Sequence, residues 1–310
     1  MKQRQRGAAV IVAILIVTLA ASTASFAIWE QSIWVRQLEN IGDRAKADQL
    51  ATSAIDIARN VLKQDKDDDQ KANRQVDDLK ENWATKITLP GEDALVSGEL
   101  TDQQGLFNLN NLIRSGATAT PDELERLQEL QRLLEILGIK HSTELATAIA
   151  EWVNNDTGST VDLEYLGRNP PYRAAQREMV DVGELALIKG FTEDKDAVRM
   201  LTPYVTALKK GTTVNVNTAK LEVLQAMRDL SFAKTVVGLR DAEPLKDLSK
   251  LPQPIPNQPT CPDTCYSVKS DYFTVTTRVK SGRVESGYTA LLDRSAGQWP
   301  SIKWRKDAAD

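Results

Sequence analysis

The stretch that decides the fold is AAVIVAILIVTLAASTASFAI, from Ala8 to Ile28. It contains no charged residue, and a helix of about 20 apolar residues is long enough to cross a bilayer. Residues 1–7 carry three basic side chains and no acid, and Trp29 and Trp34 follow the run as residues suited to a membrane–water interface. The positive N-terminal flank predicts a cytoplasmic N-terminus and a chain that continues on the other side of the membrane.

Two interpretations of this stretch compete, a cleaved secretory signal and the start of a permanent helix. The small residues from Ala20 to Ser25 fit a signal cleavage site, but the apolar run is longer than the roughly 7–15 residues of a signal core. An apolar residue also recurs every three or four positions after the run, without a helix breaker. We therefore predict one helix over 8–62, which spans the membrane over 8–28 and is amphipathic over 29–62. The recurring positions are Trp34, Leu38, Ile41, Ala45, Leu50, Ala54, Ile57 and Val61.

The middle of the chain, residues 105–250, is predicted to be helical. Thr120, Pro121 and Glu123 form a capping box ahead of a leucine stripe that stops at Gly138. Several helices joined by short links indicate a compact all-α unit. Further helix starts are expected at Ser142, at Asp181 and at Asn217 or Thr218.

The segments on both sides of this helical middle are predicted to be β-structure. Residues 270–280 alternate, with Phe273, Val275 and Val279 on one face and polar side chains on the other. The remaining strands are expected over 83–89, 94–100, 284–292 and, at an edge, 302–304.

Together these patterns predict an α+β chain. It has a long N-terminal helix, β-segments within 63–104 and 251–310, and an all-α segment over 105–250 between them. A chain of 310 residues has room for two modest domains beyond the helix. The net charge of −4 gives no general basic field of the kind that attracts nucleic acid.

A short basic leader that ends in Gly7, followed directly by an apolar helix from Ala8, resembles the N-terminus of type IV pilin-like proteins. The resemblance implies that a prepilin peptidase cleaves between these two residues. Most such proteins carry Glu at the fifth mature position, where this chain has Val12. In that family the Glu compensates the N-terminal amine of a neighbouring subunit, and a buried amine without its carboxylate is costly. The missing Glu therefore indicates a special position in a filament.

Further motifs extend the resemblance, over nearly the whole chain, to the type II secretion minor pseudopilin K family. Gly105–Leu112 reads GLFNLNNL, and Pro170–Ala175 reads PPYRAA. The resemblance implies the arrangement of the parts: the amphipathic half of the long helix packs on an antiparallel sheet built from segments 63–104 and 251–310, and the all-α segment 105–250 is an insertion between them. It also implies an inner-membrane anchor, a periplasmic C-terminal domain and a place at the tip of the pseudopilus that exports folded proteins. The partners it implies are minor pseudopilins I and J, other pseudopilins and inner-membrane secretion components. Shared motifs also include Glu151-Trp152, Tyr165-Leu166 and Asp181–Leu185.

Two acidic segments are candidates for binding calcium. After the second middle helix, Asp156, Asp162 and Glu164 offer carboxylate oxygens of the kind that calcium prefers. Members of the resembled family bind calcium, and a solvated acidic loop is the alternative. The segment 64–81 is also rich in aspartate. It is interpreted either as a solvated surface or as an acidic site that binds a partner or calcium.

The chain has only two cysteines, Cys261 and Cys265, and one histidine. This set is too small for a conventional zinc site. If the domain lies outside the cytoplasm, oxidising conditions favour a disulfide between the two cysteines, and two free thiols are the alternative.

Two other classes of function are alternatives. Residues 214–227, VNVNTAKLEVLQAM, resemble the opening of a helix-hairpin-helix module, which holds DNA phosphates on backbone amides. The segment that follows has a single glycine, Gly238, and few basic residues, so we predict a packing module and no nucleic-acid partner. His141 is the single histidine available to a hydrolase, and no evident nucleophile or acid pair accompanies it. We therefore predict that the chain is not an enzyme.

Overall fold

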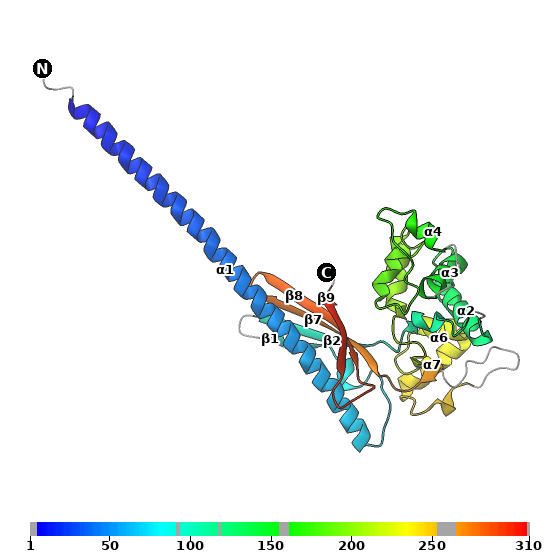
Figure 1. Ribbon diagram of the computed structural model, residues 1–310. Helices are drawn as coiled ribbons and strands as arrows, with labels where there is room; N and C mark the ends of the chain where they lie inside the picture. Colours follow the sequence, from blue (N-terminus) through cyan, green and yellow to red (C-terminus); the bar gives the residue numbers. More distant parts are fainter. Residues whose placement is uncertain (1–4, 91–93, 117–118, 155–160, 253–264, 309–310) are drawn as a thin grey trace.

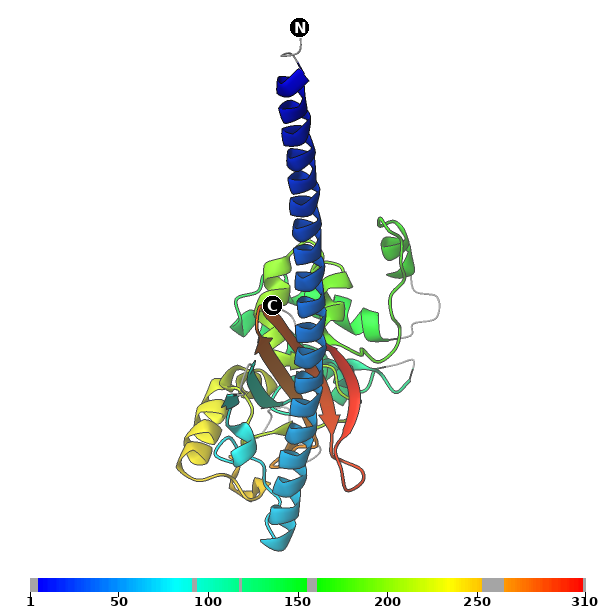
Figure 2. The same ribbon diagram turned by 90° about the vertical axis from the view of Figure 1, so that its left-hand side faces the viewer.

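The structure, a computed structural model, describes residues 5–90, 94–116, 119–154, 161–252 and 265–308. It has three parts: a long helix, a five-stranded sheet packed on the C-terminal half of that helix, and a helical domain (Figure 1). Seen from the side, the helix lies in front of the sheet and the helical domain lies behind it (Figure 2). The predicted α+β architecture with an inserted helical unit is confirmed.

The long helix, α1, runs from Gln5 to Lys71. Its C-terminal half buries one face against the sheet, as expected of an amphipathic helix, but that face is not the predicted one. None of the eight predicted positions is buried, and Ile57 is 47% exposed, because the sheet packs on a neighbouring face that is rich in small alanines. The helix continues past its predicted end at Leu62. Lys63 pairs with Asp67 at 2.5 Å one turn away, so charges that suggest a solvated loop instead support further helical turns. The buried positions of α1 are Ala47, Ala51, Ile55, Ala58 and Leu62.

The sheet has the strand order β1-β2-β7-β8-β9, and every neighbouring pair is antiparallel. β2 and β7 lie side by side although the whole helical domain separates them in sequence. The strands are β1 (Ile87–Pro90), β2 (Ala94–Asp102), β7 (Tyr272–Ser281), β8 (Val284–Asp293) and β9 (Ser301–Asp307).

The core between α1 and the sheet follows the predicted alternation of β7. Phe273, Val275 and Val279 are all buried. Trp83 packs edge-on against Phe273 with ring centroids 5.0 Å apart. Trp83 lies in a 3-10 turn, η1 (Asn82–Ala84), and not in the strand predicted over 83–89, because its indole nitrogen donates to Glu81 Oε2 at 2.7 Å.

The helical domain contains six α-helices among the described residues. Their links are not all short as predicted, since segments 167–194 and 202–220 separate successive helices. The predicted capping box is confirmed: the Thr120 hydroxyl accepts from the Glu123 amide, and the Glu123 carboxylate accepts from the Thr120 amide. The helices are α2 (Pro121–Ile136), α3 (Ser142–Val153), α4 (Val161–Leu166), α5 (Lys195–Leu201), α6 (Leu221–Met227) and α7 (Leu230–Ala242). The 3-10 turns are η2 (Leu109–Leu112), η3 (Val182–Leu187), η4 (Thr202–Tyr204) and η5 (Leu248–Lys250).

The helical domain contributes to two short parallel strand pairs, and only the second of them connects it to the rest of the fold. β3 (Phe107–Asn108) pairs with β4 (Val205–Thr206), and β5 (Val214–Asn215) pairs with β6 (Tyr266–Ser267). The second pair brings the segment before α6 beside the segment that leads into β7.

Two predicted helix starts differ from the structure. Asp181 caps the 3-10 turn η3 instead of an α-helix, and its side chain accepts from the Gly183 amide. The N-cap of α6 is Lys220, not Asn217 or Thr218. Asn217 instead exchanges two hydrogen bonds with the backbone of Leu245, a contact that local helix signals do not reveal.

Candidate functional site

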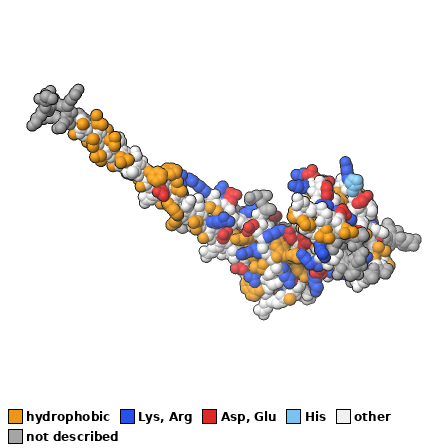
Figure 3. All heavy atoms as spheres, turned by 45° about the horizontal axis from the view of Figure 1, so that its top comes forward, with side chains coloured by type: hydrophobic (Ala, Val, Ile, Leu, Met, Phe, Trp, Pro, Cys, Tyr) orange, Lys and Arg blue, Asp and Glu red, His pale blue; other side chains and the backbone are white. Residues whose placement is uncertain are grey.

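The first half of α1 exposes its apolar side chains on all sides. Among the described residues, one helix is long and apolar enough to cross a membrane, and it begins at Ala8. Val12 is 57% exposed, and hydrophobic side chains lie along the visible face of this part of the helix (Figure 3). A soluble domain does not keep so large an apolar surface in water, so lipid or neighbouring subunits must cover it.

A second feature lies where the three parts of the molecule meet, and we call it the polar joint. Its members come from the loop after α1, from β2, from the helical domain, from the segment before β7 and from the end of β8, and all are buried. Buried polar groups are kept in proteins when their hydrogen bonds are satisfied. The polar joint consists of Asp77, Asp102, Asn215, Thr218, Ser270 and Arg294.

Arg294 is the positive centre of the polar joint. Its guanidinium donates to the Ser270 carbonyl at 2.9 Å and to Asp65 Oδ2 at 2.8 Å, and it also bonds the Asp77 carboxylate. The same group stacks over the Phe273 ring, 4.7 Å from its centroid. Burial alone lowers the pKa of Arg294, but the Asp77 and Asp65 carboxylates outweigh burial and raise this pKa above its ordinary value.

Asp102 is the acceptor centre of the polar joint. Its Oδ2 accepts from Asn215 at 3.2 Å, from the Ser270 hydroxyl at 2.6 Å and from the Thr218 hydroxyl. Burial raises the pKa of Asp102 to about 6, although these hydrogen bonds act in the opposite direction. Asp77 behaves similarly: burial raises the pKa of its carboxyl, and the charge of Arg294 opposes the rise.

The joint fixes the helical domain to the rest of the molecule. Asn215, in β5, donates to the Asp77 carbonyl, to Asp102 and to Ser270 from a single amide group. One side chain of the helical domain therefore bonds the loop after α1, the sheet and the chain entering β7. A buried and fully bonded network of this kind defines one orientation between the parts.

The raised pKa of Asp102 predicts a pH dependence of stability. The folded protein has a pKa of about 6 at this group, against about 3.9 in an unfolded chain. The folded state therefore holds more protons between these values, and the contribution of Asp102 to stability falls as the pH rises from about 4 to about 6. The measurement is the free energy of unfolding in urea at pH 4 and at pH 7. We expect Asp102→Asn to reduce the difference between these two values by up to about 3 kcal/mol. Glu285→Gln, on the exposed end of β8, should leave it unchanged.

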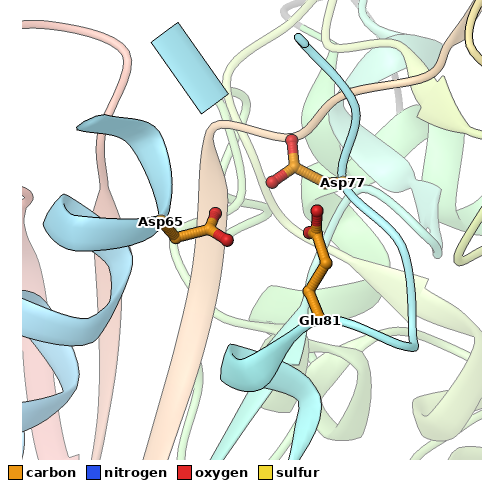
Figure 4. A group of neighbouring side chains, drawn as sticks. All are labelled: Asp65, Asp77 and Glu81. Atoms are coloured by element: carbon orange, nitrogen blue, oxygen red, sulfur yellow. The ribbon is translucent and has the colours of Figure 1, made fainter. Parts of the chain in front are cut away.

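Three carboxylates face one another beside the joint (Figure 4). Asp65 from α1 and Asp77 and Glu81 from the following loop place one oxygen each within 4.8 Å of one another. Arg294 bonds the first two, and Arg74 bonds Glu81, so the carboxylates already have positive partners. Burial raises the pKa of Asp65 to about 6, although Arg294 acts in the opposite direction. Three carboxylates of the acidic segment 64–81 thus belong to an ion-pair network, whereas more than half of the segment is exposed.

The three residues predicted to bind calcium are described only in part. Asp156 lies outside the described residues, as does the side chain of Asp162, which belongs to α4. The Glu164 carboxylate is half exposed and lies 3.5 Å from Lys189 Nζ, which also pairs with Glu151 at 2.8 Å. Calcium at this loop therefore stays a prediction.

The PPYRAA segment is anchored by its tyrosine. Tyr172 donates its hydroxyl hydrogen to the Leu187 carbonyl at 2.7 Å. Its ring lies against those of Tyr165 and Trp152, with centroid distances of 5.4 and 6.4 Å. This aromatic group holds the loop after α4 against α3.

The GLFNLNNL segment contains a buried residue whose role sequence reasoning missed. Asn110 donates to the carbonyls of Met179 and Leu208 at 2.9 and 2.7 Å, and it accepts from the Met179 amide at 2.8 Å. Its side chain therefore ties together three segments of the helical domain. An asparagine in a turn motif gives no signal of partners so distant in sequence.

The processing and disulfide predictions concern residues at the margins of the described structure. Gly7 and Ala8 lie in the first turns of α1, and cleavage between them stays a prediction. Cys261 lies outside the described residues, so its pairing with Cys265 also stays a prediction. Cys265 itself is buried beside Arg126.

The features that suggested a DNA-binding module and a hydrolase, the turn between α6 and α7 and His141, have structural roles. At the turn between α6 and α7, Asp229 accepts from the Phe232 amide, so an acid occupies the helix N-terminus where a phosphate would bind. His141 is exposed at the N-terminus of α3, with a left-handed backbone at φ 57°.

The exposed apolar helix and the sheet packed on its second half define the class: a membrane-anchored, pilin-like subunit with a large helical domain. The family model described as type II secretion system protein K matches residues 105–210. Type II secretion system protein K of Pseudomonas aeruginosa is 30% identical over 346 aligned positions that cover 99% of both chains. The protein of the same name from Aeromonas hydrophila is 30% identical over 87% of both chains. This chain belongs to the type II secretion system protein K family, and it is a minor pseudopilin.

A solved structure shares most of this fold. It is a chain of the GspK-GspI-GspJ complex from the type 2 secretion system of enterotoxigenic Escherichia coli, with a TM-score of 0.73 and 23% identity. The match covers 88% of this chain and 100% of that one.

Proposed function

We propose that this chain is the tip subunit of the pseudopilus, where it initiates or caps the filament that exports folded proteins across the outer membrane. The observation that carries the proposal is the place of the helical domain. The polar joint holds this domain on the side of the sheet away from α1 (Figure 2). A bulky domain held beside the shaft limits the addition of another subunit there, which suits an end position. Val12, in place of the usual Glu, supports the same position.

The membrane placement belongs to this proposal. The basic residues before the apolar run favour a cytoplasmic N-terminus, which puts the sheet and the helical domain in the periplasm, with the anchor in the inner membrane. In this position the chain acts through contacts with other subunits and not as an enzyme.

We propose minor pseudopilins I and J as direct partners, since the solved structure of the same fold comes from a complex of the three proteins. The test is a pull-down with the part of the chain after Trp34. This part keeps every buried position of α1, the first of which is Ala47. A stable complex with the soluble parts of I and J is expected. Absence of a complex, together with DNA binding that weakens as salt rises, would favour the helix-hairpin-helix alternative.

Leader processing gives a separate prediction. Gly7→Ala is expected to block removal of residues 1–7 and to leave the sheet and helical domain unchanged. Gly7 lies in the first turn of α1, and the N-terminal end of α1 is far from both (Figure 1). The measurement is the mass of the N-terminal peptide from membranes that contain the prepilin peptidase. Gly42→Ala is the control, because a Cβ at Gly42 meets no atom within 4 Å. A correctly processed Gly7→Ala protein would contradict the pilin-like interpretation.

We also propose calcium at the loop that holds Asp156, Asp162 and Glu164. The donor set fits in part: Glu164 offers a half-exposed carboxylate, whereas the nearby Asn154 side chain is used in hydrogen bonds to Arg114 and Leu112. A calcium titration measured by calorimetry is expected to show binding. Asp156→Asn should weaken the calcium affinity at least about tenfold, since this affinity depends on the number of charged ligands. Glu144→Gln, at the other end of α3, is the control. Equal affinity in both variants would remove calcium from this loop.

A further inference from the structure

Gly42 is the weak point of the long helix α1. It is exposed, and a Cβ added there would meet no atom within 4 Å, so no close packing requires a glycine at this position. Glycine is the poorest helix former after proline, because it loses the most backbone freedom when it becomes helical. Apart from Gly7 in its first turn, α1 contains no other glycine. The helix therefore carries a weakening residue that packing does not explain.

Gly42 lies where α1 leaves the sheet. Side chains are exposed throughout 8–42, burial begins at Asp43, and the first fully buried position is Ala47. The Asp43 carboxylate lies against the turn between β7 and β8, where a Cβ added to Gly282 would come within 2.7 Å of Asp43 Oδ2. The sheet thus holds α1 from Asp43 onward, and the part before it extends free of the sheet (Figure 1).

The residues around Gly42 carry the signals of one helix that ends and another that begins. Residues 40–43 read NIGD. Glycine is the usual residue just after a helix C-terminus, since it adopts the left-handed conformation without a steric penalty. Aspartate is a preferred N-cap residue, because its carboxylate accepts from the free amides of the next turn. Glu39 and Asp43 are also like charges four positions apart, which destabilises a continuous helix.

We propose that Gly42 is a hinge at which α1 breaks into two helices, so that the head changes its tilt relative to the membrane anchor. The head is the sheet, the helical domain and α1 from Asp43 onward. In the broken state Gly42 takes the left-handed conformation that ends the anchor helix, and the Asp43 carboxylate caps the helix of the head. This inference goes beyond the tip position, because it requires only that α1 is anchored in a membrane.

The hinge lies outside the membrane. Gly42 is 42 − 28 = 14 residues beyond Ile28, the last residue of the apolar run, and this places it about 21 Å along the helix axis. The interfacial layer of a bilayer extends only about 5–8 Å beyond the hydrocarbon core. The backbone groups that a break releases therefore form hydrogen bonds to water, whereas a break within 8–28 would leave them unsatisfied in lipid.

The hinge frees the head from the orientation of the anchor. The buried positions of α1, from Ala47 to Leu62, fix this part of the helix to the sheet, so a continuous α1 would turn the head by the same angle as the anchor. The polar joint keeps the head together as one body. A break at Gly42 therefore lets the anchor keep its orientation in the bilayer while the head takes the tilt that its neighbours impose.

The test is the distance between two nitroxide labels on the full-length chain in lipid nanodiscs, measured by pulsed electron paramagnetic resonance. One label replaces Gln31, before the hinge, and the other replaces Lys303 in β9; both side chains are exposed. Arg305 of the same strand reaches Thr52 of α1. Thr52 is 52 − 31 = 21 residues beyond the first label, or about 32 Å along α1, a distance that the method measures well. Ketone-bearing amino acids carry the labels, so the native cysteines stay untouched.

The wild-type chain is expected to show two populations of distances, one for the continuous helix and one for the broken helix. Gly42→Ala should lower the second population about fivefold, since alanine favours a helix over glycine by about this factor. Gly238→Ala is the matched control. Gly238 is exposed in α7, and a Cβ added there also meets no atom within 4 Å, so the variant gains the same helix propensity within the head and should leave both populations unchanged.

Substitutions at Asp43 test the cap. Asp43→Ala removes the capping side chain, whereas Asp43→Asn keeps one of similar strength. Both variants remove the like charge four positions from Glu39, so the difference between them reports the cap alone. The broken population should be at least about twofold smaller in Asp43→Ala than in Asp43→Asn.

The outcomes separate this inference from the proposed function. A single narrow distance distribution in the wild-type chain, equal to that of Gly42→Ala, would overturn the hinge. A second population that Gly238→Ala lowers as much as Gly42→Ala would overturn it as well, and equal populations in the two Asp43 variants would overturn the capped break. The proposed function is tested by the capture of I and J, which none of these distances measures, so each fails without the other.

Discussion

Replacing Arg294 with alanine is expected to lower the free energy of unfolding by about 3–5 kcal/mol, as for other buried ion pairs that lose one partner. The Arg294 side chain is 7% exposed and that of Asp77 only 2%, so the variant leaves a buried carboxylate without its cation. The Ser270 carbonyl loses its donor as well. Urea unfolding of the part of the chain after Trp34 measures the loss.

The surface arginine Arg305 supplies the control for this prediction. It lies on edge strand β9 with its guanidinium 4.4 Å from the Tyr288 ring centroid, and Arg305→Ala should cost less than about 1 kcal/mol. Adding Asp77→Asn to Arg294→Ala should recover part of the loss, because the uncompensated charge disappears. An Arg294→Ala variant as stable as Arg305→Ala would contradict the role given to the polar joint.

Replacing Asn110 with alanine is expected to cost about 3 kcal/mol or more. The change leaves the Met179 amide and the Met179 and Leu208 carbonyls buried without their partner, and each unsatisfied buried group costs about 1–3 kcal/mol. We expect the loss to appear as a lower melting temperature of the helical domain. The fluorescence of Trp152, which lies in the core of this domain, measures that temperature.

Gln131→Ala is the matched control for Asn110. Gln131 donates to Glu135 one turn away on the exposed face of α2, and such pairs contribute a few tenths of a kcal/mol. Equal melting temperatures for Asn110→Ala and Gln131→Ala would show that the segments tied by Asn110 are held by packing alone.

The sequence predicted elements whose signals are local. The apolar run from Ala8, the alternation around Phe273 and the Thr120 capping box each depend on neighbours within one helix or strand, and the structure has all three. The order of the parts came from the resemblance to a family. Boundaries were less accurate: α1 extends to Lys71 because charged residues spaced by one turn support a helix as well as they suit a solvated loop.

The polar joint was not predictable from the sequence, and the reason is physical. Asp77 and Arg294 are 217 positions apart, and their ion pair exists only because the sheet brings them together. Asn215 and Asp102, which lie in unremarkable strands, give no sign of burial in composition or periodicity. Long-range pairing of polar groups leaves no local pattern, whereas apolar periodicity does.

The most direct test of the tip assignment is the position of this chain on the filament. A short tag after the C-terminus, which follows edge strand β9, can be labelled with gold on isolated pseudopili and located by electron microscopy. The account predicts label at one end of each filament only. Label spaced along the filament length would show that the chain is a shaft subunit and would contradict the proposed role of the helical domain.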